Sequence, residues 1–282
     1  DKDHFIAQAK MMRAMIYFTR ARLFGKLMIV DRVIDANEDM RFSRTKTIKE
    51  TYDFILNDLQ DAANDLPVEA GNKQGILTRG AALALIAEVA LHGAAYIEEG
   101  AAAYYELGRK ASEELFALGV YELDSDYKKL FNDFTYAMNS KEVILAQWRH
   151  ADNTTFENTW MQQLGLNTNN DKNIADALPK LQDDFLAWPL AFPSVDLVNS
   201  YLVVDEDGKA KEWNQTSYYN NFKANGGYVS DAIYTNRDSR FYATVVYDST
   251  KYFNSVVTTR TKGNIHWNSN VYGDWGMTKT GY

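Results

Sequence analysis

The sequence has no cysteine, and its basic residues do not outnumber its acidic ones. Without cysteine, disulfides and thiolate metal sites are excluded within these 282 residues, although the cellular compartment is not fixed by this absence. Lys and Arg number 30 against 38 Asp and Glu, both signs are interspersed, and the net charge is −8. Because no basic stripe is available to neutralise phosphates, we expect no nucleic-acid partner.

Long apolar runs are also missing. No window approaches the roughly eighteen uninterrupted apolar residues that a membrane-spanning helix needs. The sequence shows no charged, then apolar, then small-residue leader either. It starts almost inside a helical pattern and stops at Thr280-Gly281-Tyr282, so we expect a fragment of a longer protein whose targeting signals lie elsewhere.

The motifs of common enzymes are mostly absent. There is no Gly-x-Ser-x-Gly elbow, no phosphate-cradling glycine loop and no His-Glu-x-x-His zinc helix. Carboxylate pairs such as Glu98-Glu99 are expected to be solvated, because neighbours along a chain rarely face one another across a sugar. Asp205-Glu206-Asp207-Gly208 opens like a calcium loop but lacks a glutamate at the twelfth position. We therefore expect a plain turn and no cofactor, with Ca²⁺ as the alternative.

Helical periodicity begins at once. In the segment from Phe5 to Gly25 apolar residues recur three or four apart, and the final glycine suits a left-handed C-terminal cap. We expect the segment to be a core helix with one apolar stripe facing its partner. The stripe consists of Phe5, Ala9, Met12, Ile16 and Leu23, widened by Ile6, Met15 and Phe18.

Three further helices are predicted in the next hundred residues. Thr47-x-x-Glu50 is a capping box that opens the second helix, and Pro67 ends it. The third helix is expected at 78–98 and the fourth at 102–118. The third is rich in alanine, and Gly93 is expected where the backbone of a neighbour crowds it. Helical hairpins with a small-residue face resemble tetratricopeptide (TPR) repeats, although the spacing is too irregular for a strict array.

The character of the sequence changes after residue 120. Glu142 to Trp148 is predicted to be a strand, and Phe241 to Tyr247 is predicted to pair as a strand with Ser255 to Thr261. A short helix is expected from Ser194 to Leu202. The asparagine-rich stretch from Ala151 to Asn173 is predicted to be a long loop of the kind that carries function.

These patterns predict a mainly α fold. Divergent TPR-like helical hairpins at 1–120 form the scaffold. An irregular, loop-rich region with a few short β-strands at 121–282 packs with them in the same globular unit, which is expected to be incomplete at its C-terminus.

Several motifs resemble, in order, those of the SusD/RagB family, the lipid-anchored outer-membrane nutrient-binding proteins of gut Bacteroidetes. The motifs are Arg13-Ala14-x-x-Tyr17-Phe18 with Leu23-Phe24-Gly25, Asp58-Leu59 to Leu66-Pro67, Thr78-Arg79-Gly80-Ala81-Ala82-x-Ala84-Leu85, Pro193-Ser194-x-Asp196-Leu197-Val198-x-x-Tyr201, and Arg237-Asp238-Ser239-Arg240-Phe241-Tyr242-Ala243-Thr244-Val245. The last is the most specific, and Ser239 stands where the family usually has proline. The resemblance spans nearly the whole chain.

Aromatic residues in polar, asparagine-rich stretches are the best candidates for a ligand site. A pyranose ring has apolar C–H faces and a hydroxyl rim, so a sugar site needs flat aromatic platforms beside amide and carboxylate hydrogen-bonders. Alternatively, each tryptophan plugs the small β-rich region. The predicted ligand-binding residues are Trp160, Trp213, Asn214, Tyr218, Tyr219, Asp231, Trp267 and Trp275.

The family resemblance implies a non-enzymatic protein of the outer-membrane surface that captures glycan. It further implies a SusC-like TonB-dependent transporter as partner, which receives the glycan, and an N-terminal lipid anchor outside this chain as the only membrane attachment. A RagB-like protein of the same architecture that binds oligopeptides is the first alternative. A glycosidase is the second.

Overall fold

The computed structural model describes residues 2–39, 41–69, 75–148, 192–252 and 255–258. The chain divides into two compact units, the first made of 1–125 and 133–148 and the second of 126–132 and 149–282. Helices dominate the described residues, and the predicted mainly α fold is confirmed. Among these helices, none combines the length and the apolarity needed to cross a membrane.

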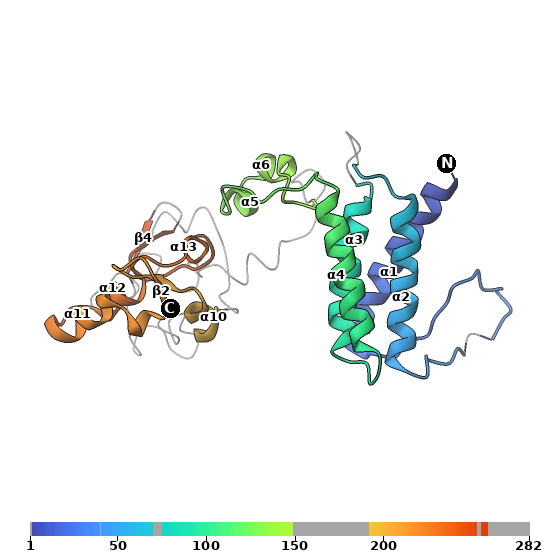
Figure 1. Ribbon diagram of the computed structural model, residues 1–282, viewed down its shortest axis with the longest axis horizontal. Coiled ribbons are helices and arrows are strands. Elements are labelled where there is room, and N and C mark those ends of the chain that lie inside the picture. Colours follow the sequence, from blue (N-terminus) through green and yellow to red (C-terminus); the bar gives the residue numbers. More distant parts are fainter. Residues whose placement is uncertain (1, 40, 70–74, 149–191, 253–254, 259–282) are drawn as a thin grey trace, which may run out of the picture. The chain divides into compact units, whose positions relative to one another are not determined.

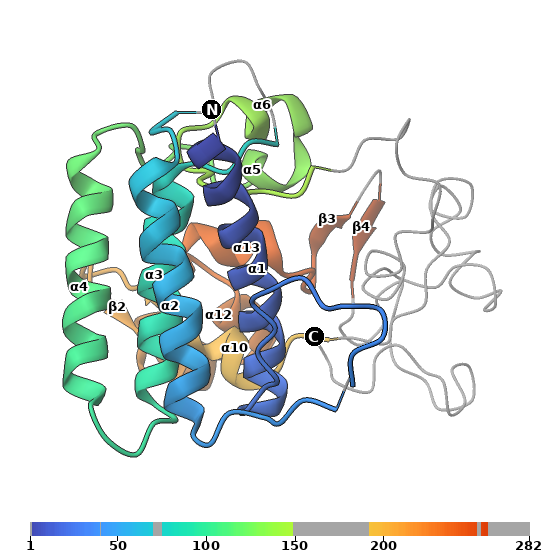
Figure 2. The same ribbon diagram turned by 90° about the vertical axis from the view of Figure 1, so that its right-hand side faces the viewer.

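Four long helices form the first unit. They are α1 (Lys2–Phe24), α2 (Ile48–Asp65), α3 (Arg79–Ala94) and α4 (Ala101–Ala117). Each packs on the next along the chain. Figures 1 and 2 show them side by side from two directions. The predicted run of helical hairpins is therefore present, with helix ends within a few residues of those expected.

The predicted caps explain where these helices start and stop. Gly25 has φ +65°, and its N–H donates to the Ala21 carbonyl at 2.8 Å. At the start of α2, Thr47 Oγ1 accepts from the Glu50 N–H at 3.1 Å, while the Glu50 carboxylate accepts from the Lys46 N–H at 2.9 Å. The capping box is thus confirmed, with the glutamate reaching one residue further back than in the standard motif.

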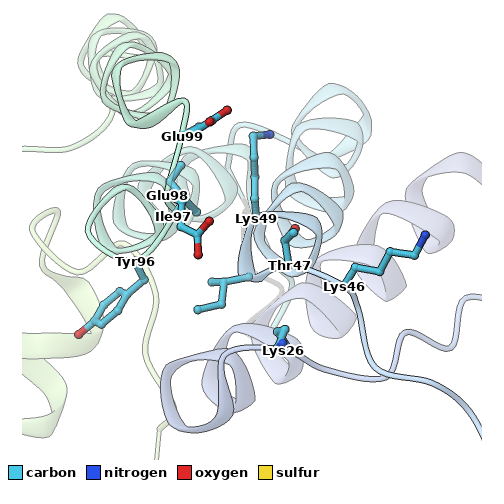
Figure 3. Close-up of a pocket in the computed structure, with 9 residues that line it drawn as sticks. Lys26, Lys46, Thr47, Lys49, Tyr96, Ile97, Glu98 and Glu99 are labelled. Atoms are coloured by element: carbon cyan, nitrogen blue, oxygen red, sulfur yellow. The ribbon is translucent and has the colours of Figure 1, made fainter.

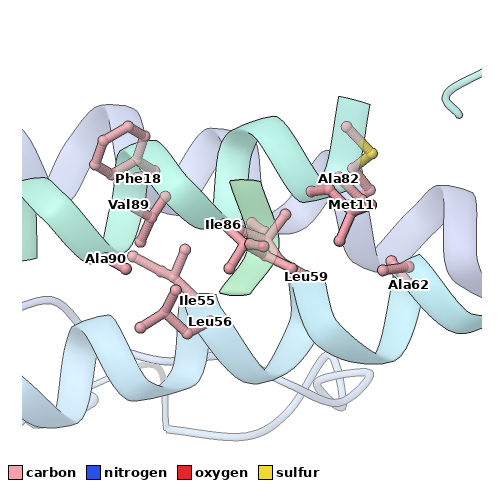
Figure 4. Close-up of a cluster of buried hydrophobic side chains, with 14 of the residues drawn as sticks. Met11, Phe18, Ile55, Leu56, Leu59, Ala62, Ala82, Ile86, Val89 and Ala90 are labelled. Atoms are coloured by element: carbon pink, nitrogen blue, oxygen red, sulfur yellow. The ribbon is translucent and has the colours of Figure 1, made fainter. Parts of the chain in front are cut away.

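The core of the first unit lies between α1, α2 and α3. Figure 4 shows Met11 and Phe18 of α1 meeting Ile55 and Leu59 of α2 and Val89 of α3. All five are at most 3% exposed. Burial of each such side chain stabilises the fold by about 1.5–3 kcal/mol, so this seam holds the helices together.

The predicted orientation of α1 is wrong for most of the stripe, of which only Phe18 is buried. Phe5, Met12, Ile16 and Leu23 are between 57% and 71% exposed, and Ala9 is exposed too. The face that contacts the core instead consists of Ala7, Met11, Ala14, Phe18 and Ala21. Both sets recur every three or four residues, so periodicity cannot choose between them. The alanine-rich set lets the neighbouring helix approach closely, and it is the one that is buried.

Two of the motif residues of α1 fix its surroundings. The Arg13 guanidinium donates two hydrogen bonds of 2.7 Å to the carboxylate of Asp58 on α2, which raises the pKa of Arg13. The Tyr17 hydroxyl accepts from the Val30 N–H at 2.8 Å and donates to the Met28 carbonyl at 3.2 Å. These motif positions therefore hold α2 and the segment after α1 against the helix.

Gly93 is crowded, as predicted, but by side chains. A Cβ at this position would lie 2.7 Å from Tyr52 Cδ1 and 2.8 Å from Tyr104 Cε2. Both tyrosines are at most 5% exposed, and burial raises the pKa of Tyr52 to about 12. The predicted backbone neighbour is thus corrected to two buried aromatic rings.

The predicted strand at Glu142 to Trp148 is also wrong. This segment is irregular, and it follows a short helix, α6 (Phe134–Asn139). The Glu142 N–H donates to Ser140 Oγ at 3.1 Å, and the Glu142 carboxylate accepts from the Asp124 N–H at 2.6 Å. A strand needs a neighbouring strand to complete its hydrogen bonds, and these local side-chain contacts take the place of a ladder here.

Short elements make up the described part of the second unit. The helices are α5 (Lys129–Asn132), α10 (Val195–Ser200), η2 (Trp213–Gln215), α11 (Ser217–Asn225), α12 (Val229–Ile233) and α13 (Ser239–Thr244). Two antiparallel hairpins join them: β1 (Val203–Val204) with β2 (Ala210–Lys211), and β3 (Thr250–Tyr252) with β4 (Ser255–Val257). The predicted helix after Pro193 is confirmed as α10, with Ser194 as its N-cap.

The predicted pairing of Phe241 to Tyr247 with Ser255 to Thr261 is wrong. Residues 239–244 form α13, and β4 pairs with β3 instead. Asp238 caps α13 by accepting from the Arg240 N–H at 2.9 Å, and Phe241 is fully buried against Tyr234. The cap and this burial override the β-favouring composition of the segment.

Candidate functional site

Three of the predicted aromatic residues lie on one stretch of the second unit. Trp213 belongs to η2, while Tyr218 and Tyr219 belong to the first turn of α11. Thr216 links the two elements, because its hydroxyl donates to the Trp213 carbonyl at 2.7 Å and accepts from the Tyr219 N–H at 3.2 Å. This fully buried threonine therefore fixes the turn that brings Trp213 next to α11.

Trp213 and Tyr219 contact each other. Their ring centroids are 5.0 Å apart at 79°, an edge-to-face arrangement. The Trp213 Nε1–H donates to Asn199 Oδ1 at 3.1 Å, and the Lys223 ammonium lies 4.8 Å from the Tyr219 ring centroid. Both rings are half-buried, so each keeps an accessible portion while its orientation is held by neighbours.

Polar residues lie on the short helices that carry this pair and on the helix that packs against them. Asn214 is exposed beside Trp213, and Asp231 is exposed on α12, which packs against both η2 and α11. Tyr218 is half-buried, and its hydroxyl accepts from Asn236 Nδ2 at 3.5 Å. The structure thus brings together five of the predicted residues, Trp213, Asn214, Tyr218, Tyr219 and Asp231, on three adjoining short helices. We call this set the aromatic cluster.

Asp205 anchors the cluster to the β1–β2 hairpin. Its carboxylate accepts from the Ser217 N–H at 3.0 Å and from the Lys211 ammonium at 2.6 Å. These hydrogen bonds, from Lys211 first and Ser217 second, hold the pKa of Asp205 well below its usual range. The turn predicted at Asp205 to Gly208 is present, and Asp205 is directed to the start of α11. Sequence reasoning missed this role, since the partner Ser217 is twelve residues away.

Arg237 is the second anchor that sequence reasoning missed. Its side chain is buried and donates to the backbone carbonyls of Ile233 and Val198 at 2.6 Å each and of Tyr201 at 2.7 Å. The guanidinium also lies 5.2 Å from the Phe241 ring centroid. Arg237 therefore joins α10, α12 and the start of α13, so the most specific family motif supports the fold that holds the cluster.

The other predicted site residues, Trp160, Trp267 and Trp275, lie outside the described residues. Their part in a site stays a prediction. Within the described ranges, no group of three or more His, Asp and Glu side chains could hold a metal ion.

A cavity of about 310 Å³ opens in the first unit, at the end where α2 begins and the α3–α4 connection passes. Figure 3 shows Thr47 and Lys49 on one side and Tyr96, Glu98 and Glu99 on the other. Its lining mixes lysines with glutamates and contains a single aromatic ring. None of the predicted ligand-binding residues lines it, and its volume is at the lower limit of small-molecule sites. The aromatic cluster is the better candidate for a saccharide.

The sequence is similar to those of SusD-like proteins. Residues 1–91 match the SusD-like family described as starch-binding and associating with the outer membrane. A SusD-like protein of Bacteroides ovatus is 24% identical over 209 residues, which are 72% of this chain and 35% of that protein. The chain thus spans about a third of the length of this curated relative.

Solved structures show the same fold. A SusD-like protein of Bacteroides fragilis superposes with a TM-score of 0.64 at 25% identity, covering 88% of this chain and 44% of the other. A SusD-like carbohydrate-binding protein of the same species gives a TM-score of 0.68 at 22% identity, covering 92% of this chain and 43% of the other. The sequence match over residues 1–91 and the shared fold agree with the resemblance to the SusD/RagB family that the motifs carry.

Proposed function

We propose that the full-length protein containing this chain binds glycans at the cell surface and has no catalytic role. The observation that carries the proposal is the aromatic cluster: Trp213 and Tyr219 are half-buried in edge-to-face contact, Asn214 is exposed next to Trp213 on η2, and Asp231 is exposed on α12, which packs against η2 and α11. Flat rings suit the apolar faces of a pyranose, and the amide and carboxylate suit its hydroxyl rim. The fold shared with a SusD-like carbohydrate-binding protein supports the same function.

The rigidity of the cluster supports binding as well. Trp213 is held by Asn199, the turn by Thr216, and α11 by Asp205. A platform that is already oriented loses little conformational freedom when a sugar binds, which favours affinity.

Delivery of the glycan to a transporter is the finer part of the proposal. The match of residues 1–91 to a family described as associating with the outer membrane supports an outer-membrane location. The motif resemblance to the SusD/RagB family further implies a lipid anchor outside residues 1–282 and a SusC-like TonB-dependent transporter that receives the ligand. Because the chain covers 35% of its curated relative, these properties belong to the full-length protein.

A glycan array and a pool of oligopeptides, both probed with the full-length protein, test this proposal. We expect saccharides to bind, to be recovered unhydrolysed, and to bind less well to Trp213→Ala. Trp148→Ala is the matched control, because Trp148 lies in the first unit with 36% of its surface exposed. Binding of peptides alone would replace the proposal by a RagB-like function. Hydrolysis of a bound oligosaccharide would replace it by a glycosidase.

A further inference from the structure

The exposed side of α1 carries a row of large apolar residues. Phe5, Met12, Ile16 and Leu23 are 71%, 57%, 62% and 69% exposed. Spacings of seven, four and seven residues place them on one side of the helix. Single exposed apolar residues are ordinary on protein surfaces, whereas several large ones along one side of a helix mark an interaction site. We call these four residues the outer stripe.

The outer stripe is separate from the face that builds the core. The opposite side of α1 already supplies Met11, Ala14 and Phe18 to the packing with α2 and α3. The helix is therefore apolar on two sides. A helix of this kind is normally buried on both, whereas a helix at the surface of a bundle has one polar side.

The last of the four long helices, α4, has a mostly charged outer side, as expected of a helix at the surface. The exposed side of α4 carries the charged residues Glu106, Arg109, Lys110 and Glu113, together with two exposed aromatic residues, Tyr105 and Phe116. Arg109 pairs with Glu106 at 2.7 Å and also with Glu113, and Lys110 approaches Glu106 at 3.7 Å. In stacked helical repeats, the terminal helix presents a polar outer face, while inner helices present apolar faces to the next repeat. By this criterion α4 is the last helix of the stack, whereas a further helix is expected against the outer side of α1.

The charged residues of α1 indicate which kind of segment would pack on the outer stripe. α1 contains five basic residues and one acidic residue, Asp3. Lys10 and Arg13 pair with carboxylates of α2, and Arg22 approaches Glu88 of α3 at 3.9 Å. The exposed Arg20 has no ion-pair partner among the residues that the structure describes. A second copy of α1 would bring the same excess of positive charge and is disfavoured. An occupant with acidic residues beside its apolar positions fits better.

The length of the relatives indicates where the occupant comes from. The chain covers 35% of its Bacteroides ovatus relative and 44% of a Bacteroides fragilis structure, so related proteins hold more than half of their residues outside the matched part. We propose that, in the full-length protein, the outer stripe of α1 is covered by an amphipathic helix from the polypeptide outside residues 1–282, with acidic residues flanking its apolar side.

Cysteine labelling tests the proposal, because residues 1–282 contain no cysteine of their own. Ile16→Cys in the outer stripe and Phe116→Cys on α4, 81% exposed, are introduced separately into the purified full-length protein. Maleimide labelling rates are read at each site by peptide mass spectrometry and normalised to the rates in denaturant. Met12→Cys repeats the measurement at a second stripe position in case the first variant does not fold.

The proposal predicts that the stripe cysteine labels about tenfold or more slowly than the α4 cysteine in the monomeric protein, since a packed helix protects what it covers. Equal labelling rates at the two sites in a monomer would overturn it. Protection that disappears when a dimer dissociates on dilution would also overturn it, and would make a second copy the occupant.

Discussion

We expect replacement of glycine by alanine to change the free energy of unfolding in opposite directions at two positions in neighbouring helices, Gly93 and Gly108. Gly93→Ala places a methyl group 2.7 Å from Tyr52 Cδ1 and 2.8 Å from Tyr104 Cε2, two rings that the core holds in place. Overpacking of this kind costs about 1–3 kcal/mol, more than the roughly 1 kcal/mol that alanine gains over glycine within a helix. We expect Gly93→Ala to lower the free energy of unfolding.

Gly108→Ala is the matched control for that prediction. The nearest atom to a Cβ at Gly108 is the Ala87 carbonyl oxygen at 3.5 Å, an ordinary contact. This variant is expected to raise the free energy of unfolding by up to about 1 kcal/mol. Urea unfolding followed by far-ultraviolet circular dichroism measures both. If the two variants changed stability in the same direction, the packing described at Gly93 would be wrong.

Substitution by lysine tests whether Arg237 anchors the second unit. Lysine at this position keeps the positive charge but lacks the planar fork in which Nε donates to Ile233 while Nη1 donates to Val198 and Tyr201. Hydrogen bonds from a charged group are worth about 1.5–3 kcal/mol each when their partners are buried. We expect Arg237→Lys to destabilise the second unit by about 2–3 kcal/mol, measured as faster limited proteolysis in that unit.

Arg240→Lys provides the comparison within the same motif. Arg240 is exposed and pairs with Asp238, which holds the pKa of Asp238 at about 2. Exposed pairs contribute less than about 1 kcal/mol, so this variant is expected to resist proteolysis nearly as well as the wild type. Similar cleavage rates for the two lysine variants would mean that Arg237 is not an anchor.

At the scale of elements, Asp205 couples the β1–β2 hairpin to α11. The pKa of its carboxyl is lowered in the folded protein, so the unfolded state binds the proton more tightly. The stabilisation is therefore complete above the unfolded pKa of about 4 and is lost as the pH falls through the lower, folded value. Asp205→Asn removes this contribution at neutral pH.

Urea midpoints at pH 6 and pH 3 measure the effect. We expect Asp205→Asn to be clearly less stable than the wild type at pH 6, with a smaller difference at pH 3. Glu206→Gln, a change at the exposed neighbour, is expected to leave both midpoints near the wild-type values. A stability difference that is the same at both pH values would show that the charge of Asp205 does not hold the hairpin to α11.

The sequence predicts some elements well and others poorly, for physical reasons. The ends of α1 and α2 follow from Gly25 and Thr47, because caps are local signals. The exposed side of α1 could not be predicted, since both of its apolar faces have helical spacing. Nor could α13, where Asp238 and the burial of Phe241 outweigh a β-favouring composition.

In the candidate site, the residue types could be predicted from the sequence, whereas their proximity and their anchors could not. Composition alone indicated Trp213, Tyr219 and Asp231, because aromatic and polar residues gather in that stretch. Their proximity depends on η2, α11 and α12, three short helices in a stretch without clear periodicity. The anchors that hold them reach across twelve or more residues, so no local pattern reveals them.

At the scale of the whole molecule, we propose that the helical unit is a scaffold and that the second unit recognises the ligand. The first unit has a continuous core from α1 to α4, and most of the residues that line its described cavity are lysines and glutamates, with a single aromatic ring among them. The aromatic cluster lies more than a hundred residues after α1 in the chain and offers the rings that a sugar requires. Substitutions in the two units should therefore affect binding differently.

Calorimetric titration of the full-length protein with its best array oligosaccharide tests this claim most directly. Truncation of an aromatic side chain at the centre of a binding site typically costs about 2 kcal/mol or more, a weakening of roughly 30-fold or more. We predict such a loss for Trp213→Ala and an unchanged affinity for Trp148→Ala, with both variants folded by circular dichroism. Unchanged affinity in Trp213→Ala, or an equal loss in both variants, would contradict the assignment of the site to the aromatic cluster.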